Sequence, residues 1–179
     1  MMVDWKTSIQ EEREAKDDYF GTNPRSPLPP EDRESFDGLE YYPPKEKYRF
    51  ELPLHEYESK TTVTVGTSAD GEQDYLQWGE FRFEIDGETV TLQAYKSDPQ
   101  DDRLWVPFRD ATSGEETYGA GRYLDLEPDT HQTADGTWIL DFNQAYNPTC
   151  AYSDDYECPL PPTENWLDVA IKAGEQAYK

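Results

Sequence analysis

Short stretches of alternating apolar and polar residues fill the chain from residue 48 onward, and they constrain the fold more than any other feature. Residues 60–66 and 89–95 are rich in β-branched side chains and alternate in polarity, which indicates strands with one buried face. Asp86-Gly87 separates two such runs, and Asp135-Gly136 predicts a second turn of the same kind. We expect about eight strands in total, and residues 75–78 and 80–85 are two of them.

Helical patterns do not alternate with these strands, so antiparallel pairing is expected. Residues 4–20 suit a helix because Trp5, Ile9 and Phe20 recur near one face. Asp4 or a nearby residue should cap this helix, and Gly21 should end it. The sequence therefore predicts a mainly β chain, folded as a single antiparallel β sandwich or barrel-like domain with an N-terminal helix. Its expected parts are that helix in residues 1–22, a Pro-rich extended linker in 23–47 and the β domain in 48–179. The end of the chain, residues 165–178, fits either a helix or a strand.

The chain is extremely acidic, with 39 Asp and Glu against 16 Lys and Arg and a formal net charge of -23. The acidic residues occupy nearly every loop, and in molar salt the Debye length falls to about 3 Å, so that such charges cease to repel at range. We therefore expect a soluble, cytoplasmic, halophilic protein with an acidic surface. The alternative is an acidic protein that binds cations or basic partners.

The same composition argues against two classes of partner. Binding to a nucleic-acid backbone needs clustered Lys and Arg, which the chain lacks. A membrane is not expected either, because no apolar run approaches the length of a membrane span and residues 1–4 do not begin a signal peptide.

Polar side chains are set into apolar and glycine-rich sequence between residues 103 and 162, which is unfavourable unless they pair or bind something. Arg109 either clamps an anionic group or forms a salt bridge that holds the turn after it. Arg122 follows two glycines, but the third glycine and the helix of a dinucleotide fingerprint are missing. It either pairs with Asp141 or forms the wall of a pocket.

Residues 141–148 carry the densest group of amide, carboxyl and phenol side chains. These groups either hold a long turn or surround a ligand. The candidate ligand-binding residues are Arg109, Arg122, Tyr123, Asp141, Asn143, Tyr146 and Asn147. The acidic insert at residues 125–135 lacks the glycine of a calcium loop and is expected to be exposed surface.

Cys150 and Cys158 are the only cysteines, so the chain is not a disulfide scaffold. The acidic residues between them, Asp154, Asp155 and Glu157, disfavour a reactive thiolate. We expect a structural role for both, as a disulfide or as two packed thiols. Neither a metal-ligand spacing nor a nucleophile motif is present, so no metal and no cofactor are expected.

Several sequence blocks occur together in an order typical of one family. They are Ser26-Pro27-Leu28, Phe36-Asp37-Gly38-Leu39, Val106-Pro107-Phe108-Arg109-Asp110, Thr117-Tyr118-Gly119-Ala120-Gly121-Arg122-Tyr123-Leu124, Asp141-Phe142-Asn143-Gln144-Ala145-Tyr146-Asn147-Pro148 and Cys158-Pro159-Leu160-Pro161-Pro162. On these blocks the chain resembles the domain-of-unknown-function family 1684 over almost its whole length. The resemblance implies a mostly β domain with a compact polar signature. It also favours an extended C-terminal segment, and it implies no reaction.

Three functions remain open from the sequence. The first is binding of a small organic anion in a pocket formed by the candidate residues. The second is a hydrolase-like enzyme in the same pocket, with Asp141 as base and Arg122 stabilising negative charge. The third is a buried structural network in a protein that acts by contacting a partner. Binding is preferred, because no nucleophile, acid–base pair or metal set is recognisable.

Overall fold

The computed structural model describes residues 5–153 and 156–178. It is mainly β, with two antiparallel sheets and an N-terminal helix, which confirms the predicted fold class. The described strands do not close into a barrel. The strands are β1 (Arg49–Leu52), β2 (His55–Gly66), β3 (Glu72–Ile85), β4 (Glu88–Lys96), β5 (Leu104–Phe108), β6 (Arg122–Leu126) and β7 (Trp138–Asp141).

The larger sheet is a meander in the order β2-β3-β4-β5-β6, and β1 pairs with β7 in the smaller one. The predicted hairpin at Asp86-Gly87 joins β3 to β4, and both turn residues have positive φ, 50° and 83°. This is the geometry for which Asp-Gly is favoured. The turn at Asp135-Gly136 differs, because among its residues Gly136 alone has positive φ and the turn leads into β7 from a single bridge.

One long strand, β3, replaces the two strands expected at residues 75–78 and 80–85. Its pairing with β4 shifts by one residue between Gln77 and Gly79, which marks a bulge. A Cβ at Gly79 would lie 2.8 Å from the backbone oxygen of His55 on β2. Glycine therefore allows a close approach of two backbones and does not end the strand.

The N-terminal helix, α1 (Trp5–Thr22), buries Ile9 and Phe20. It runs past Gly21, where the sequence had placed its end, and a cap at Asp4 would lie outside the described residues. The stretch expected as an extended linker contains a short helix, α2 (Pro30–Glu34), and a buried Leu28.

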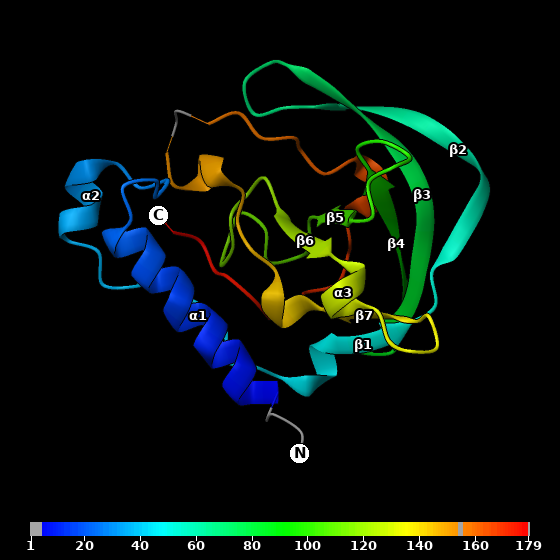
Figure 1. Ribbon diagram of the computed structural model, residues 1–179, viewed down its shortest axis with the longest axis horizontal. Coiled ribbons are helices and arrows are strands. Elements are labelled where there is room, and N and C mark those ends of the chain that lie inside the picture. Colours follow the sequence, from blue (N-terminus) through cyan, green and yellow to red (C-terminus); the bar gives the residue numbers. More distant parts are fainter. Residues whose placement is uncertain (1–4, 154–155, 179) are drawn as a thin grey trace.

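The C-terminal segment is neither a helix nor a regular strand. It passes between α1 and the strands of the larger sheet (Figure 1). Ile171, Ala173 and Glu175 are buried in it, and isolated bridges connect it to Arg109 and Tyr41. Its extended course allows its backbone carbonyl groups to face the buried end of β6.

The larger sheet has two faces of different character. One face contributes to the apolar core, with Phe81, Leu92, Val106 and Leu124 fully or almost fully buried. The register places Tyr95, Trp105 and Asp125 side by side across β4, β5 and β6 on the other face. This second face is where the candidate site lies.

Candidate functional site

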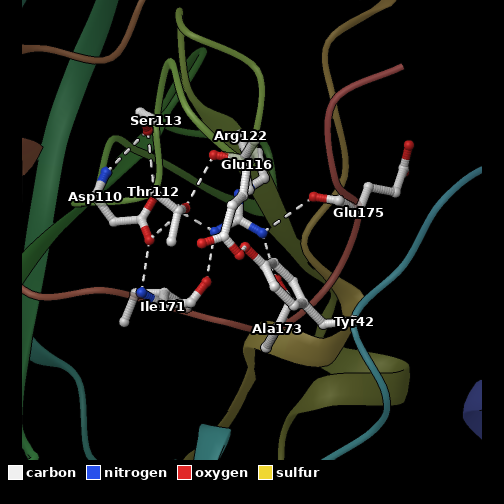
Figure 2. A network of polar contacts seen from close by, with 10 residues as sticks. Tyr42, Asp110, Thr112, Ser113, Glu116, Arg122, Ile171, Ala173 and Glu175 are labelled. Carbon is white, nitrogen blue, oxygen red and sulfur yellow. Dashed lines mark hydrogen bonds and ion pairs between the residues drawn. The ribbon is translucent and has the colours of Figure 1, made fainter. Parts of the chain in front are cut away.

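Arg122, at the start of β6, is completely buried, and its guanidinium donates to three backbone carbonyls of the C-terminal segment. These acceptors are the oxygens of Ile171 at 2.9 Å, of Glu175 at 3.2 Å and of Ala173. Figure 2 shows the guanidinium enclosed between Asp110 and this backbone. Burial lowers the pKa of Arg122, and the nearby Asp110 carboxylate opposes that shift.

Asp110 balances the buried charge of Arg122, at 3.5 Å. The same carboxylate accepts from the Ile171 backbone N–H at 2.6 Å and from the hydroxyls of Thr112 and Ser113 (Figure 2). Arg122 thus pairs with Asp110. The pairing with Asp141 that the sequence suggested is not formed. The arrangement joins the β5–β6 connection to the C-terminal segment and uses nearly all the bonding capacity of both charged groups.

Asp141 and Asn143 are likewise occupied by the protein itself. Asp141 ends β7 and accepts from the Trp5 indole at 2.8 Å and from the Asn143 backbone and amide at 2.9 and 2.8 Å. The Asn143 side chain also exchanges two bonds with the Lys45 backbone. These contacts connect α1, β7 and the entry to β1, which is a structural task.

The remaining arginine and amide of the predicted set lie apart. Arg109 places its guanidinium 4.6 Å from the ring centroid of Trp166, which is half exposed. Asn147 is buried and donates to the backbone oxygen of Gln176 at 3.0 Å. Neither residue lines the cavities described below.

Cys150 and Cys158 are free thiols packed against each other's segment, with the Cys150 N–H 3.4 Å from the Cys158 sulfur. Burial raises the pKa of Cys150, as expected for a packed thiol. The carboxylates of Asp154 and Asp155 lie outside the described residues.

Tyr123 and Tyr146 lead to a cavity on the second face of the larger sheet, here called the aromatic pocket. It has a volume of about 260 Å³ and receives side chains from β3, β4, β5 and β6. Its lining residues are Tyr75, Tyr95, Ser97, Asp101, Arg103, Trp105, Tyr123, Asp125, Tyr146 and Pro159. The structure therefore brings together two of the seven predicted residues, and it surrounds them with aromatic groups from earlier strands.

The rings of this pocket support one another around Trp105. Tyr75 stacks on Trp105 with centroids 4.5 Å apart, and Tyr123 meets it edge to face at 5.2 Å. Tyr146 meets Tyr123 in the same way at 5.8 Å. Such stacked and edge-to-face pairs stabilise the aromatic walls of the pocket.

Arg103 and Asp125 are the charged groups that distinguish this pocket from the Arg122 network. The Arg103 guanidinium is exposed and forms neither an ion pair nor a side-chain hydrogen bond with any described residue. Asp125 accepts from the Tyr146 hydroxyl. Burial raises the pKa of Asp125 above its ordinary value, although the Tyr146 hydrogen bond and Arg103 oppose the shift.

Sequence reasoning missed Arg103 and Asp125. It assigned Asp125 to an exposed insert, and that expectation is wrong at this position, because Asp125 lies within β6 and lines the aromatic pocket on the second face of the sheet. The signal was the alternation itself: Tyr123 and Asp125 alternate with the core residues Leu124 and Leu126. Reading the polar positions of each strand as a second face would have placed both beside Trp105.

Residues 5–153 and 156–178 contain no group of three or more His, Cys, Asp or Glu side chains placed to hold a metal ion. Nor does any helix in these ranges combine the length and apolar character needed to cross a membrane.

The fold and the pocket define a mainly β protein with an aromatic cavity on the outer face of its larger sheet. By sequence the chain belongs to the family described as "Protein of unknown function (DUF1684)", whose model matches residues 34–176. Its structure is similar to the solution NMR structure of an uncharacterized protein from Haloarcula marismortui, with 44% identity and a TM-score of 0.72. That match covers 97% of this chain and 94% of the other. No curated protein matches the chain.

Proposed function

We propose that this protein binds a small organic acid in the aromatic pocket, with the ring of the ligand among the tyrosines and Trp105 and its carboxylate on Arg103. The proposal keeps the ligand class expected from the sequence and replaces the guanidinium that holds it. Three residues of this pocket, Tyr123, Asp125 and Tyr146, come from the second half of the chain, where most of the sequence motifs lie.

The observation that carries the proposal is the unpaired state of Arg103. The chain has 39 acidic residues against 16 basic ones, and Asp101 and Asp125 line the same cavity, yet the Arg103 guanidinium has no described carboxylate partner. A guanidinium is suited to hold a carboxylate through two parallel hydrogen bonds. Its position at an aromatic cavity supports a ligand that joins a planar ring to an anionic group.

The size of the pocket limits the ligand to about one ring. Its 260 Å³ lies slightly below the range of about 300–1,000 Å³ that is usual for pockets of drug-sized ligands. A hydrogen-bonded contact with a charged group contributes about 1.5–3 kcal/mol. A single aryl carboxylate can therefore bind measurably without filling a larger site.

Phenylacetate is a suitable probe, with phenylacetamide as its neutral counterpart. We expect calorimetric titration in molar KCl to show binding of the acid at least about tenfold tighter than the amide. Arg103→Gln should remove this preference, whereas Arg25→Gln, which changes an exposed arginine outside the pocket, should keep it. Equal binding of acid and amide by the native protein, or no binding of either, would overturn the proposal.

A hydrolase-like activity is the second candidate, and the position of Asp125 favours it. Burial raises the pKa of this carboxyl in a cavity that reaches solvent, which suits a general acid. Asp141, the base considered from the sequence, is occupied by Trp5 and Asn143. Turnover of chromogenic aryl esters or aryl glycosides, abolished by Asp125→Asn without loss of folding, would support this candidate over simple binding.

The acidic composition supports a further part of the proposal, namely a halophilic protein that works in a salt-filled cytoplasm. The haloarchaeal relative, at 44% identity, is consistent with this origin. The salt dependence of stability, described in the Discussion, is the test.

A further inference from the structure

Tyr146 lines three cavities, the smallest of which has about 200 Å³ and lies beside Lys16. It lines the aromatic pocket of about 260 Å³, and it also lines a second cavity of about 550 Å³ on the side of α1, here called the α1 cavity. Asp125 is the other residue that both cavities share. The bond from the Tyr146 hydroxyl to Asp125 thus forms part of the wall that separates them.

The position of Tyr146 is fixed from both ends. Its backbone exchanges two hydrogen bonds with Tyr123, at 2.9 and 3.1 Å, so the side chain projects from an anchored point beside β6. Its ring packs edge to face on Tyr123, and the Lys16 ammonium lies 5.2 Å from the ring centroid. The Tyr146 hydroxyl donates to Asp125. The ring is therefore held in place between the aromatic pocket and the α1 cavity.

The α1 cavity has a mixed lining, in which polar side chains accompany Trp5, Leu124 and Ile139. Hydrogen-bonding side chains come from α1, α3 (Pro128–His131) and the turn after β7. They include Ser8, Thr130, His131 and Gln144. A ligand that extended into this space would therefore find hydrogen-bond donors and acceptors suited to hydroxyls or ether oxygens along its chain.

We propose that Tyr146 determines the length of the ligand, and that the α1 cavity is an extension subsite for a polar tail, closed off by this side chain. The inference rests on the proposed binding of an organic acid in the aromatic pocket. In the native protein the barrier restricts the ligand to a single ring with a short substituent. Removing the ring of Tyr146 joins the two cavities and admits a longer acid.

The test compares two acids that share the group that Arg103 would hold. The short probe is 4-hydroxyphenylacetate, and the long probe is a phenylacetate whose 4-position carries a hydroxyethoxyethoxy chain. Binding of each is measured by calorimetry in molar KCl for the native protein, Tyr146→Ala and Tyr146→Phe. Tyr75→Ala is the matched control, because Tyr75 lines the aromatic pocket but not the α1 cavity.

We expect the native protein to prefer the short acid by about tenfold or more, because one group that does not fit a binding site has about that effect on affinity. Tyr146→Ala should reverse the preference, Tyr146→Phe should keep it, and Tyr75→Ala should weaken both acids alike. If Tyr146→Ala does not fold, Tyr146→Leu should shift the preference in the same direction. A purely structural tyrosine would change both affinities together.

Each result has one meaning. A native protein that binds the short acid, combined with a Tyr146→Ala variant whose preference is unchanged, overturns the role of Tyr146 and leaves the proposed function standing. A native protein that binds neither acid overturns the proposed function, and the role of Tyr146 in length selection with it.

Discussion

Arg122 is the first residue of β6, and Arg103 directly precedes β5 in the same sheet. The two guanidinium groups have different surroundings. Arg122 is sealed among backbone carbonyls and Asp110, with its capacity almost fully used inside the protein. Arg103 is exposed beside an aromatic cavity and forms no ion pair or side-chain hydrogen bond with a described residue. A buried guanidinium whose two terminal nitrogens both bond within the protein serves the fold, although its Nε has no partner among the described residues. An exposed guanidinium outside any ion pair, beside an aromatic cavity, is available to a ligand.

Replacing Arg122 is expected to cause the largest change in the free energy of unfolding. Arg122→Met leaves Asp110 buried without its counter-charge, and losing one partner of a buried pair costs about 3–5 kcal/mol. Urea unfolding followed by tryptophan fluorescence measures the loss. Arg103→Met is the control and should stay within about 0.5 kcal/mol of the native protein, as exposed positions do. Native stability in the Arg122 variant would contradict the structural role.

Gly121, the residue before Arg122, should also be needed for the stability of this buried region. Gly121 has φ of +108°, and a Cβ there would lie 2.5 Å from the backbone oxygen of Phe108. Gly121→Ala should cost about 2 kcal/mol or more from strain and collision together. Gly87→Ala, at φ +83° with nothing within 4 Å, carries strain alone and should cost less in the same unfolding assay. Equal losses would show that the close approach at Gly121 is unimportant.

Salt should affect the stability contributed by surface charges and by buried charges differently. With a net charge of -23, the native protein should melt at a higher temperature in molar KCl than in dilute buffer, because its surface carboxylates repel less when screened. The deficit of Arg122→Met should stay nearly constant over the same range, because the buried Arg122–Asp110 pair is screened little. A native melting temperature that does not respond to KCl would refute the halophilic interpretation.

Replacing Asp125 should have the smallest effect on stability. The direction of the pKa shift of Asp125 determines whether the variant is more or less stable. Burial raises the pKa of Asp125, with Glu127 in the same sense and Tyr146, Arg103 and His131 opposing. A carboxyl with a raised folded pKa adds stability below its unfolded pKa, and that stability disappears as pH rises through the folded pKa. Asp125→Asn should therefore melt above the native protein at neutral pH. The gap should close towards pH of about 4, near the ordinary aspartate pKa.

A lower melting temperature for Asp125→Asn at neutral pH would contradict that sign. It would mean that the charged carboxylate, accepting from Tyr146, contributes more than its burial costs.

The sequence predicted what depends on local pattern. Alternation located the strands, and Asp86-Gly87 fixed the β3–β4 hairpin, because two consecutive positive φ angles favour these residues. The break expected between residues 78 and 80 was wrong, since Gly79 serves an approach of β2 that no local pattern reveals.

The candidate site was predicted less completely, because its members meet through long-range register. Tyr123 and Tyr146 were named, but Tyr75, Tyr95 and Trp105 become neighbours of theirs only when β3 to β6 pair in order. The partner of Arg122 depended on the course of the C-terminal segment, whose backbone supplies acceptors that no side-chain motif announces.

We propose that the aromatic pocket, and not the Arg122 network, receives the ligand. The indole N–H signals of the five tryptophans in a ¹⁵N NMR spectrum report on it directly. Titration with phenylacetate in molar KCl should move the Trp105 signal, while those of Trp5 and Trp166, whose indoles bond to Asp141 and Pro161, stay in place. A stationary Trp105 signal with shifts elsewhere, or no shift at all, would contradict the account.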